Sequence, residues 1–260
     1  MLVLEKLDTT ERPVKSNSTL HRFSTYSGNL IGGALVGVGM ALSGACPGTV
    51  QVQLAQGIPS AKLTAAGAVL GAKAYVKIEH LLAHTPECAD TPDFVARKTT
   101  ISEAARLPEL VVYVLFGVAI AAVLRFSQTE TTSSSVSPVF GGLLIGSAQA
   151  VSLLLSSSPL GASMVYEQLT RKIMQAFQGD WTSLALPDRS INFSLGVIAG
   201  STALMQRSSA PGYFSADTSI PAVHAFVGGV VMAFGARLAG GCTSGHGLSG
   251  LSAMSFSSLV

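Results

Sequence analysis

Two cysteines stand at matching places in two glycine-rich apolar stretches of the chain. Cys46 lies in GGALVGVGMALSGACPG, residues 32–48, and Cys242 lies in GGVVMAFGARLAGGCTSGHGLSG, residues 228–250. In each stretch the cysteine comes 14 residues after the first glycine of a Gly-Gly pair. A thiol near a helix start presents a soft sulfur, whose thiolate the helix dipole favours and apolar burial opposes. The repeated placement predicts that both thiols belong to one pseudo-symmetric site.

Each cysteine is followed by a break in the apolar pattern, where glycines and hydroxyl side chains gather. Uncovered backbone amides at a helix start bind anions without help from a lysine, and serine or threonine adds a donor or caps a short helix. Ordinary helix capping and close packing use the same residue types as an anion site does. The structural interpretation and the anion-binding interpretation are therefore compatible. The candidate substrate-path residues are Cys46, Gly48, Thr49, Cys242, Thr243, Ser244, Gly245 and His246. The residues expected to shape the two stretches are Gly32, Gly33, Gly37, Gly44, Pro47, Gly228, Gly229, Arg237, Gly240 and Gly241.

Arg237 and His246 flank Cys242 in the second stretch. Arg237 lies five residues before Cys242, so the two are not on the same helical face. A charge within a membrane span is costly and usually faces a cavity or a partner. We therefore expect Arg237 to be paired or to face a polar cavity. His246 either contacts the substrate or caps a short helix.

Motifs for metals and cofactors are missing from the sequence. The three cysteines lie far apart, and neither C-x-x-C nor H-E-x-x-H occurs. A phosphate-binding glycine loop with its lysine does not occur either. We expect no metal, no cofactor and no enzymatic activity. Cys88, between Pro86 and Pro92, is expected to be an incidental surface thiol.

The composition favours a membrane protein. Charged residues make up 12% of the chain and hydrophobic residues 48%, whereas a soluble domain usually has about 25% charged residues. The formal net charge is only +2, from 16 basic and 14 acidic residues, so a nucleic-acid partner is not expected. The lipid bilayer is the expected partner, and an integral position in the cell membrane is the expected location.

The apolar segments predict an all-α integral membrane protein with about six spans and short re-entrant half-helices. Residues 49–58 are too short and too rich in glutamine to cross about 30 Å of hydrocarbon, which indicates a re-entrant helix. Pro47 is expected to end the helix before it. The expected apolar helices cover residues 28–45, 61–76, 108–125, 141–155, 191–206 and about 221 onward. A partial or interfacial helix is expected at 159–178, and a solvated loop with one surface helix at 77–107.

The same segments divide the chain into two expected halves. The halves cover residues 28–128 and 139–260, each with one cysteine stretch, and residues 129–138 form the linker between them. Residues 1–27 form a polar tail. Small residues recur at four-residue intervals in several helices, which favours close helix packing in lipid. These sets are Gly33, Gly37 and Ala41; Gly67 and Gly71; and Gly142, Gly146 and Ala150.

Two motifs carry a resemblance to a known family. GMALSGACPGT, residues 39–49, and GARLAGGCTSGHGLSG, residues 235–250, resemble the YeeE/YedE family of sulfur-transport membrane proteins. The resemblance implies an hourglass of helices and half-helices that takes up thiosulfate, with Cys46 and Cys242 passing the substrate sulfur along by weak S–H···S contacts. It also implies a further span after the second motif. We therefore expect residues 248–260 to pack loosely, or to rely on a partner or lipid.

Three alternatives to a transporter of a small inorganic sulfur anion stay open at this point. A channel for another small solute could be formed where two half-helices meet in the middle. The asparagine–proline–alanine motif that aquaporin-like channels carry at that break does not occur here. A membrane sulfur-transferase would hold a persulfide on Cys242 and pass it to a partner. A structural membrane subunit would need neither cysteine.

Overall fold

The computed structural model describes residues 26–83, 100–127, 138–156, 161–179, 188–207 and 220–259. Within these ranges the chain is helical, and its β-structure is limited to an isolated bridge between Thr100 and Ser255. The all-α prediction is thus confirmed. Cys88, most of the polar tail and all of the expected linker except Pro138 lie outside the described residues.

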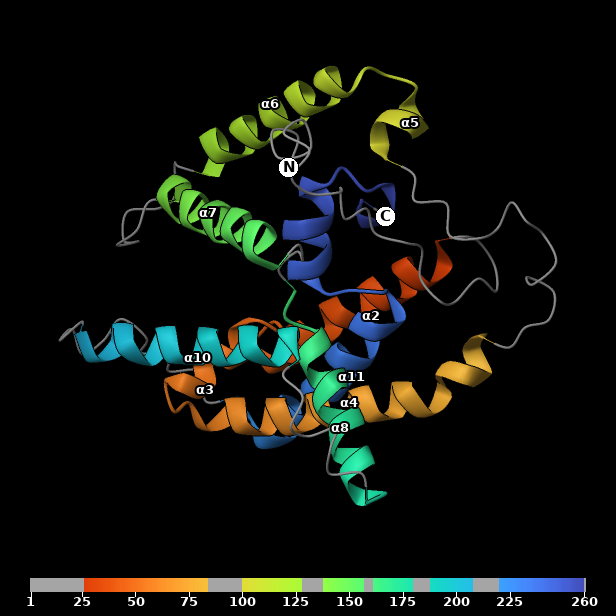
Figure 1. Cartoon of the computed structure of the whole chain (residues 1–260), viewed down its shortest axis with the longest axis vertical. Coiled ribbons are helices and arrows are strands. Elements are labelled where there is room, and N and C mark those ends of the chain that lie inside the picture. Colours follow the sequence, from red (N-terminus) through yellow and green to blue (C-terminus); the bar gives the residue numbers. More distant parts are fainter. Residues whose placement is uncertain are drawn as a thin grey trace.

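Each expected apolar segment corresponds to a helix of the structure, shown in Figure 1. Two boundaries differ from the expectation. The helix that begins at Pro59 continues to Ala83, so the loop expected from residue 77 begins later. The elements are α2 (Ser27–Ser43), α3 (Thr49–Ala55), α4 (Pro59–Ala83), α5 (Ile101–Ala105), α6 (Glu109–Ser127), α7 (Pro138–Ser156), α8 (Met164–Phe177), α10 (Arg189–Arg207), α11 (Ala222–Leu238), the π-helix η3 (Thr243–Gly250) and the 3-10 helix η4 (Phe256–Ser258).

The second difference concerns the end of α2. Pro47 was expected to end this helix, but the helix ends at Ser43, before the proline is reached. Gly44 adopts the left-handed conformation, with φ of 63°, and its N–H donates to the carbonyl oxygen of Met40 at 2.9 Å. Glycine is favoured at this position because it carries no Cβ. The chain therefore turns three residues before Pro47.

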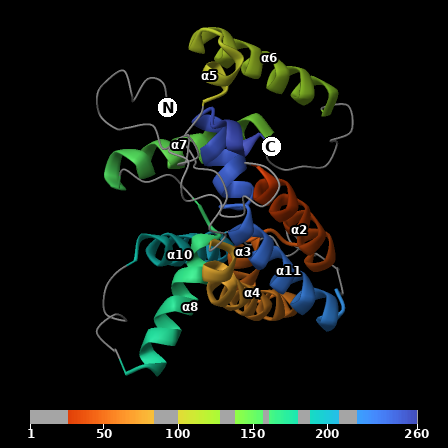
Figure 2. The same ribbon diagram turned by 90° about the vertical axis from the view of Figure 1, so that its right-hand side faces the viewer.

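Helix α11 lies at the centre of the packed helices. It contacts α4 along one side and α2 along another, and Figure 2 shows the three helices together. Helices α3 and α8 both pack on α4, and α10 packs on α3 and α8. Helices α6 and α7 lie on the side of the molecule opposite α4 (Figure 1).

Glycines bring the backbone of α11 into contact with the backbones of α2 and α4. A Cβ at Gly32 of α2 would lie 2.7 Å from the carbonyl oxygen of Gly235, and one at Gly228 would lie 2.8 Å from the carbonyl oxygen of Gly39. Toward α4, a Cβ at Gly229 would overlap the carbonyl oxygen of Thr64. Helices that approach this closely gain van der Waals contact along their whole length.

Only one of the predicted four-residue stripes makes these contacts. Gly67 and Gly71 of α4 pack directly on the backbone of α11, as expected. Gly33 and Gly37 do not, since no described atom lies within 4 Å of a Cβ at either position, and Ala41 is exposed. The contact of α2 with α11 uses Gly32 and Gly39 instead, seven residues apart on the other face. Gly142 and Gly146 of α7 likewise meet no described atom within 4 Å.

Much of the described C-terminal segment, residues 248–259, is buried, so the loose packing expected for residues 248–260 is not found there, whereas reliance on a partner or lipid stays a prediction. Ala253 and Ser255 are fully buried. Ile101 donates its N–H to the carbonyl oxygen of Met254 at 2.8 Å, and Phe256 lies against the ring of Tyr26, with centroids 5.3 Å apart. These contacts hold the C-terminal segment against α5 and the start of α2.

Among the described helices, none is by itself both long enough and apolar enough to cross a membrane. The helices α11 and η3, which meet at an angle of 42°, reach the required length and apolar character when they are taken together. Ser27–Ser43 and Val139–Leu155 are apolar but shorter. The count of about six spans stays a prediction.

The glycine contact at α11 can be tested by adding one methyl group. Gly229→Ala places a Cβ against the carbonyl group of Thr64, and we expect this overpacking to cost about 1–3 kcal/mol and to lower the melting temperature in detergent. Gly146→Ala is the matched control, because its Cβ meets no described atom within 4 Å. Equal melting temperatures for the two variants would contradict the account of the packing.

Candidate functional site

The first cysteine lies in a tight turn between α2 and α3, residues 44–49, called the Cys46 turn below. Thr49 donates its N–H to the sulfur of Cys46 at 3.3 Å, and Cys46 donates its N–H to the Thr49 hydroxyl at 2.7 Å. The Thr49 hydroxyl in turn donates to the carbonyl oxygen of Cys46 at 3.1 Å. The thiol therefore stands at the start of the short helix α3, as the sequence predicted.

The second cysteine occupies the corresponding place between α11 and η3, in residues 239–245, called the Cys242 turn below. Cys242 is buried and has extended backbone as the residue before η3. Its sulfur lies 3.0 Å from the Ser244 hydroxyl, and its carbonyl oxygen accepts the N–H of His246 at 2.8 Å. The Ser244 hydroxyl and the backbone N–H of His246 thus both engage Cys242 where the chain leaves the helix.

Both turns fold back toward the middle of the α2–α11 pair. The two helices are antiparallel, since Gly32 lies against Ala239 whereas Gly228 lies against Ser43. Cys242 packs in a cluster with Val36 and Ala236, while Ala45 of the Cys46 turn packs with Met232 in the middle of α11. Met40 contacts both clusters. The two cysteines follow opposite ends of this antiparallel helix pair, and the turns bring both of them back toward the same height along it.

A cavity of about 260 Å³ opens beside Cys242, between α2, the Cys242 turn and the C-terminal segment. Gly33 and Gly37 line it, which explains why they do not serve helix packing. Gly241 lets the imidazole of His246 lie against the turn, because a Cβ there would be 2.6 Å from Cε1 of His246. The polar and sulfur-bearing residues at the wall include Asn29, Met40, Cys242, Thr243, His246 and Ser257.

Not all of the predicted path residues meet at this cavity. Cys242, Thr243 and His246 line it, and Ser244 contacts the sulfur of Cys242 beside it. Gly245 is buried within η3. Cys46, Gly48 and Thr49 do not line the cavity.

The start of α8 joins the two turns. Ala162 donates its N–H to the Ser244 hydroxyl at 3.2 Å, and the Tyr166 hydroxyl donates to the carbonyl oxygen of Pro47 at 2.9 Å. A Cβ at Gly48 would lie 3.5 Å from that of Ala162 and 3.8 Å from the Cys46 sulfur. A segment about midway along the chain therefore stands between the two cysteine turns.

Sequence reasoning treated this segment only as a partial helix and missed its role. One signal was available, because Glu167 is the only acidic residue between positions 159 and 178. An isolated acid in a membrane protein indicates a partner of opposite charge. Arg237, the arginine beside the Cys242 turn, is that partner.

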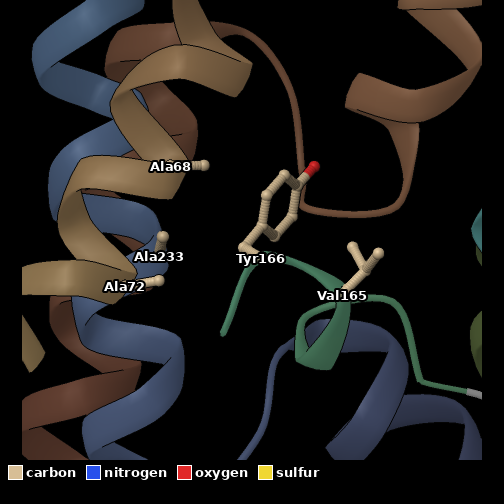
Figure 3. Close-up of a cluster of buried hydrophobic side chains, with 5 residues drawn as sticks. All are labelled: Ala68, Ala72, Val165, Tyr166 and Ala233. Atoms are coloured by element: carbon tan, nitrogen blue, oxygen red, sulfur yellow. The ribbon is translucent and has the colours of Figure 1, made fainter. Parts of the chain in front are cut away.

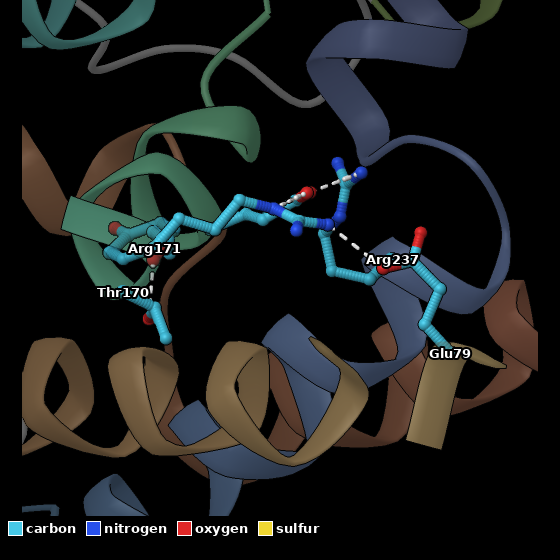
Figure 4. A network of polar contacts seen from close by, with 6 residues as sticks. Glu79, Thr170, Arg171 and Arg237 are labelled. Atoms are coloured by element: carbon cyan, nitrogen blue, oxygen red, sulfur yellow. Dashed lines mark hydrogen bonds and ion pairs between the residues drawn. The ribbon is translucent and has the colours of Figure 1, made fainter. Parts of the chain in front are cut away.

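A network of charges fixes α8 to α11 and α4, as Figure 4 shows. Arg237 forms an ion pair with Glu167, so the pairing expected for Arg237 is confirmed. Glu167 also accepts from Arg171 at 2.8 Å, and Arg171 reaches Glu79 of α4 at 2.8 Å. The guanidinium of Arg237 lies 5.9 Å from the ring centroid of Tyr75, within the range of a cation–π contact.

An apolar contact supports the same placement. Val165 and Tyr166 of α8 pack on Ala68 and Ala72 of α4 and on Ala233 of α11, and Figure 3 shows these five side chains. The small alanines let the tyrosine ring approach the two helices closely. Its hydroxyl is thereby directed at the Cys46 turn.

Family comparison identifies the chain. A sequence model of the sulphur-transport family matches residues 12–260. The chain belongs to this family, the YeeE/YedE family. A comparison with curated proteins gives no match. Membership of this family supports a transporter role rather than an enzymatic one. In its described residues, no group of three or more His, Cys, Asp or Glu side chains is arranged to hold a metal ion.

The ion pair that positions α8 can be tested by a double-mutant cycle. Glu167→Gln leaves Arg237 without its carboxylate, and we expect it to cost about 3 kcal/mol of stability. Arg237→Leu leaves Glu167 with Arg171 as its remaining partner, and we expect a smaller loss. The double variant should cost clearly less than the sum, because the two changes remove one interaction. Additive losses in detergent melting would show that the pair is not coupled.

Proposed function

We propose that this protein moves a small sulfur-containing anion, thiosulfate in our expectation, across a cell membrane. The observation that carries the proposal is the meeting of the two cysteine turns, one near each end of the chain, through the start of α8. Family membership supplies the reaction class, sulphur transport. The proposed path runs from the cavity to Cys242 and on, past the start of α8, to Cys46.

The chemistry of the turns suits an anion with a soft terminal sulfur. A thiol is a weak donor and a weak, polarizable acceptor, so it matches a terminal sulfur better than a hydrated oxyanion. The oxygens of such an anion need donors, and the hydroxyl of Thr243 and the imidazole of His246 line the cavity. Because a water molecule occupies about 30 Å³ in the liquid, a cavity of about 260 Å³ has room for a small anion with part of its hydration shell.

The charge of the path also suits transport rather than tight binding. Among the described residues, those that line the cavity include no lysine or arginine, and nearby Arg237 is engaged by Glu167. A permeating ion must be bound strongly enough to enter and weakly enough to leave. Neutral donors at the cavity meet both requirements for a doubly charged anion.

Exposed apolar side chains support an integral membrane position. Helices α6 and α7 present Leu110, Leu143 and Leu155 with exposed fractions of 70%, 68% and 83%. Large contiguous apolar surfaces are rare on soluble monomers and mark contact with lipid or protein. We therefore propose that lipid covers α6 and α7, and that the bent pair of α11 and η3 lies at membrane depth, where irregular backbone is tolerated if buried in protein.

Cysteine replacement tests the proposed path. Cys46→Ala, Cys242→Ala and the two serine variants should each lose most uptake of labelled thiosulfate by cells that lack their own uptake route, while still reaching the membrane. Serine fails because its hydroxyl holds water and harder oxyanions more strongly than a thiol does. The double alanine variant should be no worse than either single one, since two contacts in series fail together. Normal uptake by the double variant would refute the path.

Two further measurements complete this test. Cys88→Ala is the matched control, and it should retain uptake. Mass spectrometry of the purified protein, taken after incubation with thiosulfate, should find Cys242 without added sulfur. A stable persulfide on Cys242 would instead favour the sulfur-transferase.

A further inference from the structure

The start of α8 carries an inference that rests on the proposed function and deepens it. Ser163 stands at the position before α8 where a serine side chain usually caps the helix. Its hydroxyl makes no such cap and lies close to the Cys242 thiol. Tyr166, one turn later, is tied to the carbonyl oxygen of Pro47. The segment is therefore anchored at both cysteine turns, and Ala162 is held between them.

Ala162 is the side chain that packs on Gly48, between the two cysteine turns. It is 4% exposed, and its methyl group is the nearest described atom to a Cβ placed on Gly48, at 3.5 Å. The next is the sulfur of Cys46, at 3.8 Å. On its other side, the N–H of Ala162 is engaged by Ser244, which contacts the sulfur of Cys242. Only a hydrogen and a methyl group, those of Gly48 and Ala162, therefore meet beside the first thiol.

We propose that Ala162, facing Gly48, sets the width of the anion path between the two thiols and so determines the size of the anion that passes. One methylene in a pocket changes discrimination by about tenfold or more, so a single methyl group at this place has a measurable effect. The class of substrate selected is a compact sulfur oxyanion with a terminal sulfur, against longer polythionates.

Moving one methyl group from Ala162 to Gly48 tests this directly. Gly48 has an ordinary helical backbone, with φ of −81°, and a Cβ there makes contacts of normal length. Gly48→Ala should therefore fold and yet reduce thiosulfate uptake, by about tenfold. Adding Ala162→Gly to Gly48→Ala should restore most of the uptake, because removing the methyl group of Ala162 restores the width of the path. Ala162→Gly alone should raise uptake of labelled tetrathionate relative to thiosulfate, with tetrathionate measured inside as the intact anion, because its reaction with a thiol releases thiosulfate and leaves a thiosulfate group on the cysteine.

The control variant is Gly161→Ala, whose Cβ meets no described atom within 4 Å, and it should transport like the parent. The reaction of Cys242 with methyl methanethiosulfonate, measured on its own peptide by mass spectrometry so that Cys46 is counted separately, reports the cavity side. It should keep its rate in Gly48→Ala, because Gly48 does not line the cavity. A loss of this reaction would indicate damage to the fold rather than a narrower path, and would count against the proposal.

The outcomes separate this inference from the proposed function. Normal uptake by Gly48→Ala, or an unchanged ratio of tetrathionate to thiosulfate in Ala162→Gly, would overturn the role of Ala162. The proposed function would still stand if the cysteine variants lost uptake. Normal uptake by the cysteine variants would overturn the proposed function itself. If Gly48→Ala did not reach the membrane, the ratio of tetrathionate to thiosulfate uptake in Ala162→Gly alone would decide whether Ala162 sets the width of the path.

Discussion

The backbone of α11 lies against the backbones of α2 and α4, and the position of every site residue depends on this close approach. Gly228, Gly229 and Gly235 leave no side chain between the helices. In lipid the hydrophobic effect does not drive helices together, so packing over such small residues supplies the attraction. Because α2 and α11 run in opposite directions, the turns that follow them start at opposite ends. Each turn then folds back over the pair, which draws the two cysteines toward one level.

The charges around Arg237 do the second part of the positioning. Burying an arginine and a glutamate costs several kcal/mol for each ion, so the pair adds little to stability in itself. Its effect is on placement, since the pair ties α8 to α11 at the level of Glu167. Arg171 and Glu79 extend the same network to α4. The segment before Tyr166 thereby contacts both cysteine turns.

The helices and the cysteine positions could be predicted because they depend on local pattern. Apolar runs, and the glycine and proline residues that break them, are visible along the chain, and Arg237 had to be paired wherever it lay. The choice between Gly33 and Gly32 could not be predicted, because α2 carries small residues on two faces and only the position of α11 selects one. The contact of Ala162 with Ser244 was also out of reach, since it joins ordinary small residues 82 positions apart. The buried C-terminal segment depends in the same way on distant partners in α2 and α5.

The central claim is that this chain by itself conducts a sulfur anion, and reconstitution tests it most directly. The purified protein would be placed in liposomes, and the uptake of labelled thiosulfate would be compared with that of labelled sulfate. The account predicts thiosulfate uptake well above that of protein-free liposomes, with unlabelled thiosulfate competing and sulfate competing weakly. Equal uptake of the two anions, or thiosulfate uptake no greater than in protein-free liposomes, would contradict it.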